Sequence, residues 1–241
     1  MNKYYYDLHI HSCLSPCGDD DNTPANIAGM ATLCNLNVVA LTDHNTCKNC
    51  PAFFKACKRY GLIPIAGMEL TTAEDIHIIF LFEELDDALR FSDYVETRRI
   101  LFENRVDIYG EQMVMDENDE VIEVEKYLLS NATTITVEEC PALAEEFGGI
   151  AYPAHIDREA NGIISTLGTF PDIKGFKCCE FNDGSNIEKY KKLYDLGQRH
   201  TVVCSDAHYL HMMRDKENYF LIDDEPYSSA LVRKKIFELL R

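Results

Sequence analysis

Histidines and carboxylates of this 241-residue chain stand at spacings that suit metal binding. One residue separates His9 from His11, and one residue separates Asp206 from His208. On an extended chain alternate side chains point to the same side, so each pair can present both members to one divalent cation. Two such pairs indicate a metal site more strongly than either pair alone.

Further candidate ligands lie in or just after short apolar runs that are typical of buried strands. These runs are 38–41, 62–65, 76–82, 149–152, 176–181 and 201–204. His44 and His155 each follow one run, Glu69 comes shortly after another, and His77 lies inside a fourth. In a closed parallel barrel the carboxyl ends of all strands meet on one face. We therefore expect these side chains to share one centre.

Helical patterns alternate with the strand-like runs, which implies a parallel α/β sheet. The first predicted helix has Thr23 as its N-cap and Pro24 at its first position. No linker divides the chain, so we predict one domain over 1–241. Within it, 92–135 is predicted to be an insertion. It would contain a helix and then a hairpin of 112–115 and 121–124, and the helix would carry Arg98, Arg99 and Arg105.

Composition restricts the partners. Lys and Arg number 23 and Asp and Glu number 41, a formal net charge of −18, and no basic run is present. Stable binding to duplex nucleic acid is therefore not expected. No apolar run approaches the roughly 18 residues of a membrane span, and the N-terminus lacks a secretory pattern. We expect a cytoplasmic protein whose 10 cysteines are reduced thiols.

The motifs together resemble those of the polymerase and histidinol phosphatase (PHP) domain family, in its stand-alone phosphoesterase form. The likeness covers nearly the whole chain and is carried by the segments 7–12, 41–44, 67–69, His77, 153–155 and 205–208. It implies a distorted seven-stranded (β/α) TIM-like barrel. It also implies two to three divalent ions at the C-terminal face, most often zinc, with manganese or iron as alternatives.

The resemblance also implies a ligand set for each ion. The first ion would take His9, His11, Glu69 and Asp206, and the second would take Glu69, His77 and His155. The third would take His44, His208 and Cys17, which stands where histidinol-phosphatase-like members carry a histidine; Asp20 is the alternative to Cys17. Asp43 is expected to orient a ligand histidine through its ring N–H. Glu69, Asp206 and Asp43 would then be the catalytic carboxylates.

The implied reaction is hydrolysis of a small phosphate ester or nucleotide by a hydroxide held between two ions. Arg158 could clamp the phosphoryl group or form a surface ion pair, and both readings stay open. A histidinol-phosphate phosphatase, an exonuclease of the same family and a metal-stabilised binding protein without activity are the alternatives.

Cys47 and Cys50 form a second pattern, which could be a redox pair or half of a separate zinc site. A zinc motif without its partner pair is weak. We therefore favour thiols packed at the start of a helix.

Overall fold

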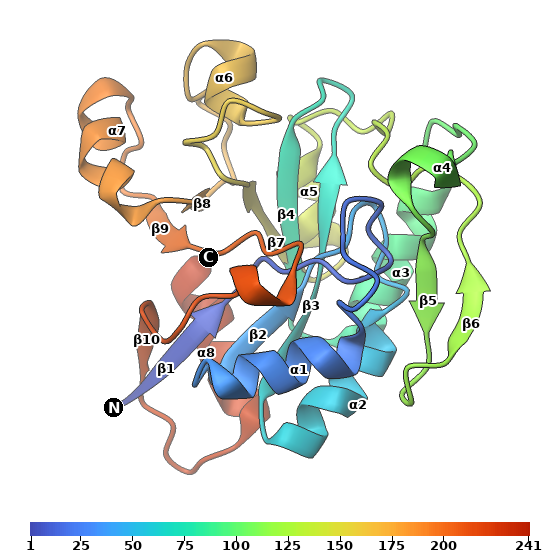
Figure 1. Ribbon diagram of the computed structural model, residues 1–241. Coiled ribbons are helices and arrows are strands. Elements are labelled where there is room, and N and C mark those ends of the chain that lie inside the picture. Colours follow the sequence, from blue (N-terminus) through green and yellow to red (C-terminus); the bar gives the residue numbers. More distant parts are fainter.

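The computed structural model describes residues 1–241 and contains a strongly curved mixed sheet (Figure 1). Its six strands lie in the order β10-β1-β2-β3-β4-β7. In chain order they are β1 (Asn2–Asp7), β2 (Val38–Leu41), β3 (Ile63–Thr71), β4 (His77–Phe82), β7 (Gly149–Pro153) and β10 (Tyr219–Ile222). Four of the predicted apolar runs thus form adjacent strands of this sheet.

Two further strands continue the curve beyond β7. β8 (Cys178–Phe181) lies beside β7 and pairs in parallel with β9 (His200–Val203). The segment after β9 then meets the segment after β1, where Ile10 and Ala207 form a parallel bridge. Seven strands therefore surround one interior, as expected for a distorted TIM-like barrel. β10 is an additional strand, not predicted from the sequence, that pairs with β1.

The direction of β4 departs from the predicted parallel sheet. β4 runs antiparallel to both of its neighbours, β3 and β7. Only 72–76 join β3 to β4, which is too short for the crossover that a parallel pair requires. As a result β4 begins at the rim where β3 and β7 end, and His77 is its first residue.

Side chains of the strands alternate between two apolar clusters. In β4, Phe80 and Phe82 pack outward against helices, whereas Ile79 and Leu81 pack inward. The outer cluster includes residues of α1 (Pro24–Leu33), α2 (Cys50–Tyr60), α3 (Leu85–Glu96) and α5 (Cys140–Glu146). The inner cluster includes four residues of α8 (Ser229–Leu240). This alternation decides which side chains face the interior.

Thr23 caps α1 as predicted, since its side chain accepts a hydrogen bond from the backbone N–H of Asn26. The shorter helices are α4 (Val106–Tyr109), α6 (Ile163–Leu167), α7 (Ile187–Leu193) and the 3₁₀ turns η1 (Gly184–Asn186) and η2 (Leu210–Met212). None of the helices combines the length and the apolar character needed to cross a membrane.

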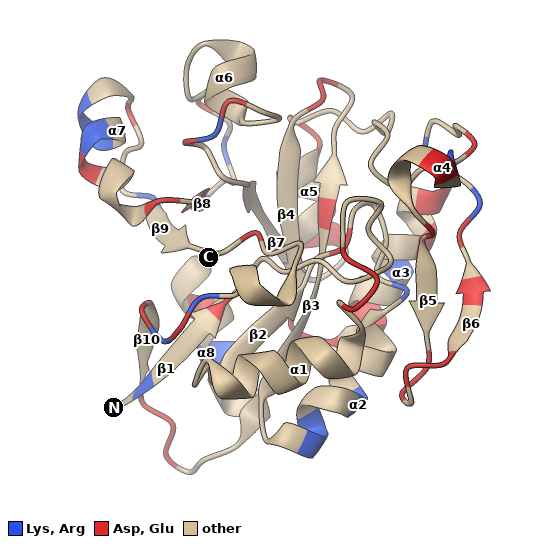
Figure 2. Cartoon of the chain, in the orientation of Figure 1, with Lys and Arg blue, Asp and Glu red and all other residues tan.

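The segment 92–135 differs in part from its prediction. The hairpin is present, with β5 (Met113–Met115) antiparallel to β6 (Val121–Val124). The helix carrying three arginines is not, because α3 ends at Glu96 and Arg105 only precedes α4. Arg98 and Arg99 instead bind the returning chain, donating to the Thr134 side chain and to the Tyr127 carbonyl. Figure 2 shows that basic residues lie on separate elements, including α2 and α7.

Candidate metal centre

All the predicted histidine and carboxylate ligands of the first two ions meet at one rim of the barrel. They come from β3, from the start of β4, and from the segments that follow β1, β7 and β9. His44, predicted for the third ion, follows β2 and joins them; the residues concerned are His9, His11, His44, Glu69, His77, His155 and Asp206. His77 reaches this rim because β4 runs antiparallel.

Glu69 lies at the middle of the centre. Met68 and Leu70 belong to the outer cluster, so the alternation of β3 turns the Glu69 side chain inward. Its carboxylate oxygens lie 2.8–3.3 Å from ring nitrogens of five histidines, namely His9, His11, His44, His77 and His155. The side chain is 1% exposed. No other carboxylate of the chain contacts as many rings.

The electrostatics of Glu69 favour its charged form. Burial raises the pKa of this carboxyl, but His77, His9 and His44 outweigh burial and hold the pKa well below its usual range. The rings respond in opposite senses. Burial lowers the pKa of His11, yet hydrogen bonds to Asp206 and Glu69 raise it to about 9. Burial and the neighbouring His11 lower the pKa of His208 to about 4. Glu69 therefore keeps its negative charge at the middle of the centre.

A first group of four side chains can hold one cation. The ligand atoms of His9, His11, Glu69 and Asp206 all lie within 4.8 Å of one another. His9 Nε2 and His11 Nε2 are 3.0 Å apart, and Asp206 Oδ1 lies 3.2 Å from each of them. This group has the same members as the set that the resemblance implies for the first ion.

A second group of ligand atoms consists of His44, Glu69 and His77. The resemblance implies His155 rather than His44 beside Glu69 and His77. His155 is nevertheless close, because its Nε2 lies 3.1 Å from the same Glu69 oxygen that His77 approaches at 2.8 Å. The second predicted set is thus brought together around one carboxylate oxygen.

The third group contains His11, His44 and His208. Cys17, predicted for this set, is exposed and lines the cavity above the centre, but it belongs to none of the three groups. Although the residue as a whole is exposed, desolvation of its thiol beside the centre, together with the charges of Glu69 and Asp206, raises the pKa of Cys17 above its usual value. Asp20, the alternative to Cys17, is exposed and also joins no group. In the structure His11 stands with His44 and His208 in this group, while Cys17 lines the cavity beside them.

The residues present fit divalent cations. Four buried atoms of the centre form no hydrogen bond of normal geometry: the Nδ1 atoms of His44, His77 and His155, and Oδ1 of Asp206. Three of these atoms, all but His155 Nδ1, lie within 3.2 Å of other potential ligand atoms without a hydrogen bond, as side chains that converge on a shared cation do. Imidazole nitrogens and carboxylate oxygens are ligands that zinc, manganese and iron accept.

Asp43 does not touch a histidine ring, so its expected direct contact is wrong. Its carboxylate accepts hydrogen bonds from the backbone N–H and the hydroxyl of Ser12, each at 2.7 Å, and from the Ser15 hydroxyl at 2.8 Å. The Ser15 oxygen in turn lies 2.9 Å from His11 Nδ1. The intervening hydroxyl therefore relays the orientation of His11, because Asp43 is too far from the ring to bind it.

Arg158 forms an ion pair with Asp206. Its side chain is 44% exposed and lines the cavity of about 380 Å³ above the centre, together with Ser130 and Asn161. An ion pair was one of the two interpretations from the sequence, but its partner is the buried carboxylate of Asp206 rather than a surface group. The guanidinium joins a predicted metal ligand to the space in which a substrate would bind.

Glu180, in β8, was missed as a site residue. It is fully buried, its Oε1 lies 2.8 Å from His9 Nδ1, and the same oxygen accepts a hydrogen bond from the backbone N–H of His155 at 3.3 Å. The available signal was a single carboxylate within the apolar run 176–181. Cys179 and Phe181 pack in the outer cluster, so Glu180 faces inward.

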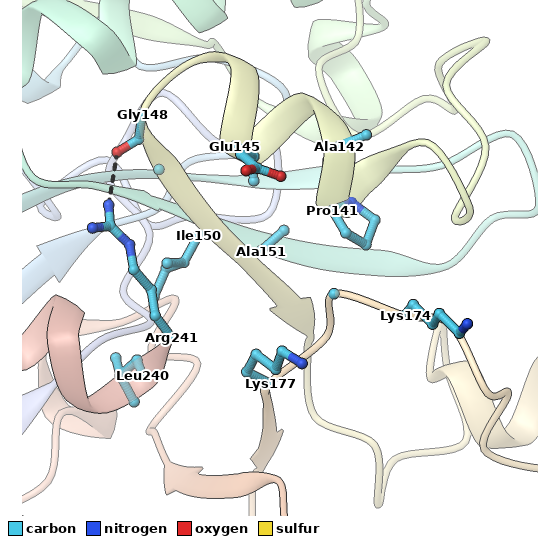
Figure 3. Close-up of a pocket in the computed structure, with 13 residues that line it drawn as sticks. Pro141, Ala142, Glu145, Gly148, Ile150, Ala151, Lys174, Lys177, Leu240 and Arg241 are labelled. Carbon is cyan, nitrogen blue, oxygen red and sulfur yellow. Dashed lines mark hydrogen bonds between the residues drawn. The ribbon is translucent and has the colours of Figure 1, made fainter.

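Size alone does not identify this site. A larger cavity of about 590 Å³ lies at the opposite rim, beside the start of β7 (Figure 3). Lys174, Lys177 and Arg241 line it, and all three are exposed. None of the clusters of potential metal ligands lies there.

Comparison with known proteins agrees with this geometry. The profile of the PHP domain matches residues 7–152, more than half of the chain. An uncharacterised protein of Methanocaldococcus jannaschii is 33% identical over 99 residues, which cover 37% of this chain and 58% of that protein. The chain thus matches little more than half of that relative's length.

Solved structures share the fold at low sequence identity. Endonuclease Q of Pyrococcus furiosus, a lesion-specific enzyme, superposes with a TM-score of 0.68 and 20% identity, over 99% of this chain and 56% of its own. A candidate metal-dependent phosphoesterase of Bifidobacterium adolescentis superposes with a TM-score of 0.62 and 15% identity, over 98% of this chain and 96% of its own. Endonuclease Q bound to a duplex with an abasic lesion gives a TM-score of 0.65 at 20% identity, over 98% of this chain and 56% of the other.

Proposed function

This chain belongs to the PHP-domain family, and from that premise we propose that it hydrolyses phosphate esters at the centre around Glu69. One observation carries the proposal: five imidazoles from separate segments surround one buried carboxylate. Burying these charged groups costs free energy, because they lose their hydration. Bound divalent cations would offset that cost.

The residues that would hold the ions are those of the ligand groups. In this proposal His9, His11, Glu69 and Asp206 bind one ion, and Glu69 with His77 and His155 binds a second. His44 and His208 would bind a third with His11 or Cys17. Bound divalent cations would supply positive charge at the phosphoryl oxygens and lower the pKa of water. Zinc is the first choice because imidazole predominates among the ligands, and manganese and iron remain alternatives.

The protein's own residues have three tasks in this reaction. Glu69 and Asp206 hold negative charge at the floor of the site, since the pKa of each lies below its usual range. Asp43 and Ser15 keep the His11 ring oriented. Arg158 stands where its guanidinium can bind a phosphoryl oxygen, because it lines the cavity directly beside Asp206.

We propose a small phosphate ester or a nucleotide as the substrate. The cavity of about 380 Å³ has the size of a small-molecule site, and the formal charge of −18 repels a long polyanion. The likeness to endonuclease Q keeps a DNA substrate as the competing candidate. Since endonuclease Q has been solved with a duplex that carries an abasic lesion, such a duplex is the DNA to test. A cytoplasmic location belongs to the same proposal, supported by ten free thiols.

The test combines metal analysis with a substrate panel. Purified protein is stripped with a chelator, reloaded with zinc, manganese or iron, and assayed on phosphomonoesters, histidinol phosphate, nucleotides, short single strands and a duplex with an abasic site. We expect metal-dependent hydrolysis of a small ester. Cleavage of the duplex alone would move the substrate to DNA. Absence of all hydrolysis by a protein that binds metal would favour the non-catalytic alternative.

A further inference from the structure

Glu180 contacts two predicted metal ligands from a different strand. Through Oε1 it binds the ring of His9, predicted for the first ion, and the backbone of His155, predicted for the second. The side chains of Glu180 and His9 are both fully buried. Nothing in the sequence motifs links Glu180 to the centre, because β8 contributes none of their residues.

The contact decides which nitrogen of His9 faces the centre. A carboxylate oxygen 2.8 Å from Nδ1 accepts the proton of that nitrogen. Nε2 is then the nitrogen that faces His11, Glu69 and Asp206 at 3.0–3.3 Å. A carboxylate behind a ligand histidine fixes the ring orientation and increases its basicity toward a metal.

Glu180 gains little as a purely structural residue. Its other oxygen, Oε2, is buried without a hydrogen-bond partner, and so is the hydroxyl of Tyr152 nearby. The surrounding side chains of Cys178, Cys204 and Tyr152 belong to the inner apolar cluster. A half-satisfied carboxyl group in such a place costs stability, so an apolar residue of similar size would suit a core without function better.

We propose that Glu180 is a positioning residue of the metal centre, holding His9 with Nε2 toward the cation and His155 by its backbone. This inference rests on the proposed metal-dependent function. It predicts that Glu180 strengthens metal binding at the expense of the stability of the metal-free fold.

The test measures zinc affinity and metal-free stability in three variants. Zinc affinity is determined by competition with a chromophoric chelator, and the melting temperature is measured on chelator-treated protein. Glu180→Met removes the acceptor at similar volume, and Glu180→Gln keeps an oxygen that can accept from Nδ1. Glu125→Met is the matched control, since Glu125 is also buried but pairs with Lys48 and Arg99 and touches no ligand.

We expect Glu180→Met to weaken zinc binding about 10- to 100-fold, the range for residues that orient metal ligands, without lowering the metal-free melting temperature. Glu180→Gln should recover most of the affinity, and Glu125→Met should leave affinity unchanged. Wild-type affinity in Glu180→Met would overturn the inference, as would an affinity loss that only follows a fall in metal-free stability. If the wild-type protein itself binds no zinc, manganese or iron, the proposed function fails and the role of Glu180 fails with it.

Discussion

The guanidinium of Arg158 is paired with the carboxylate of Asp206, a predicted ligand of the first ion. The Asp206 side chain is 3% exposed, whereas that of Arg158 is 44% exposed and borders the cavity. One end of this pair therefore belongs to the centre, and the other can contact a substrate. A phosphoryl group entering the cavity would meet a cationic side chain already held in place.

Replacing Arg158 tests its role in substrate binding. Arg158→Ala should lower kcat/KM by roughly 10-fold, mainly through KM, because a charge-assisted hydrogen bond contributes about 1.5–3 kcal/mol and this side chain is partly screened by solvent. Steady-state kinetics on the best small ester measures this. Arg158→Lys keeps the charge but not the two-pronged geometry, so intermediate activity is expected. An unchanged KM in Arg158→Ala would show that the arginine serves only its pair with Asp206.

The central carboxylate gives the sharpest prediction for activity. Glu69→Gln removes the one negative charge that five rings approach. We expect kcat/KM and the affinity for metal to fall by at least about 100-fold. That is the largest loss expected for residues that only orient the ligands. Circular dichroism should show a folded protein. Full hydrolysis by a folded Glu69→Gln variant would refute the central role of this residue.

The hydrogen-bonded chain from Asp43 through Ser15 to His11 can be tested at Ser15. Ser15→Ala breaks the link between the Asp43 carboxylate and the His11 ring, so metal affinity should fall about 10-fold. Ser12→Ala is the matched control, because Ser12 also donates to Asp43 but does not contact His11. Equal losses in the two variants would mean that Asp43 acts by folding the loop rather than by orienting the ring.

Glu125 provides a pH-dependent prediction away from the centre. Burial raises the pKa of this carboxyl, but the Tyr127 backbone N–H, Arg99 and Lys48 outweigh burial, and the net pKa is lowered. A carboxyl with a lowered folded pKa stabilises the fold above its unfolded pKa, about 4.3 for Glu, and loses this contribution as the pH falls through the folded value. Wild type should therefore exceed Glu125→Gln in unfolding free energy at pH 6, and the difference should shrink below pH 4 in urea titrations. A constant difference would rule out this linkage.

The outer core predicts a large effect on stability. Phe91 is fully buried and its ring stacks on Phe80 with centroids 4.4 Å apart. Phe91→Ala should cost about 3–5 kcal/mol in unfolding free energy. Ile122→Thr, on the exposed strand β6, should change it by less than about 0.5 kcal/mol. Urea denaturation of metal-free protein measures both.

Much of the centre could be predicted because its residues lie in short local motifs. Alternate spacing places His9 with His11 whatever the rest of the chain does, and apolar runs mark the neighbouring strands. The prediction of a helix carrying three arginines was wrong, because contacts with distant residues decide the structure of this segment. Local pattern continued the helix past Glu96, whereas Arg98 and Arg99 bind Thr134 and Tyr127, which are distant in sequence.

The amino-acid sequence by itself determined which side chains are available for metal chemistry, the strand-like runs that carry them and the capped start of α1, because these depend on neighbours within a few residues. Only the tertiary structure decided the rest. It turned β4 antiparallel so that His77 reaches the rim, placed Ser15 between Asp43 and His11, and set Glu180 behind His9. These relationships join segments up to 171 residues apart, and closure of the barrel, rather than local propensity, brings such segments into contact.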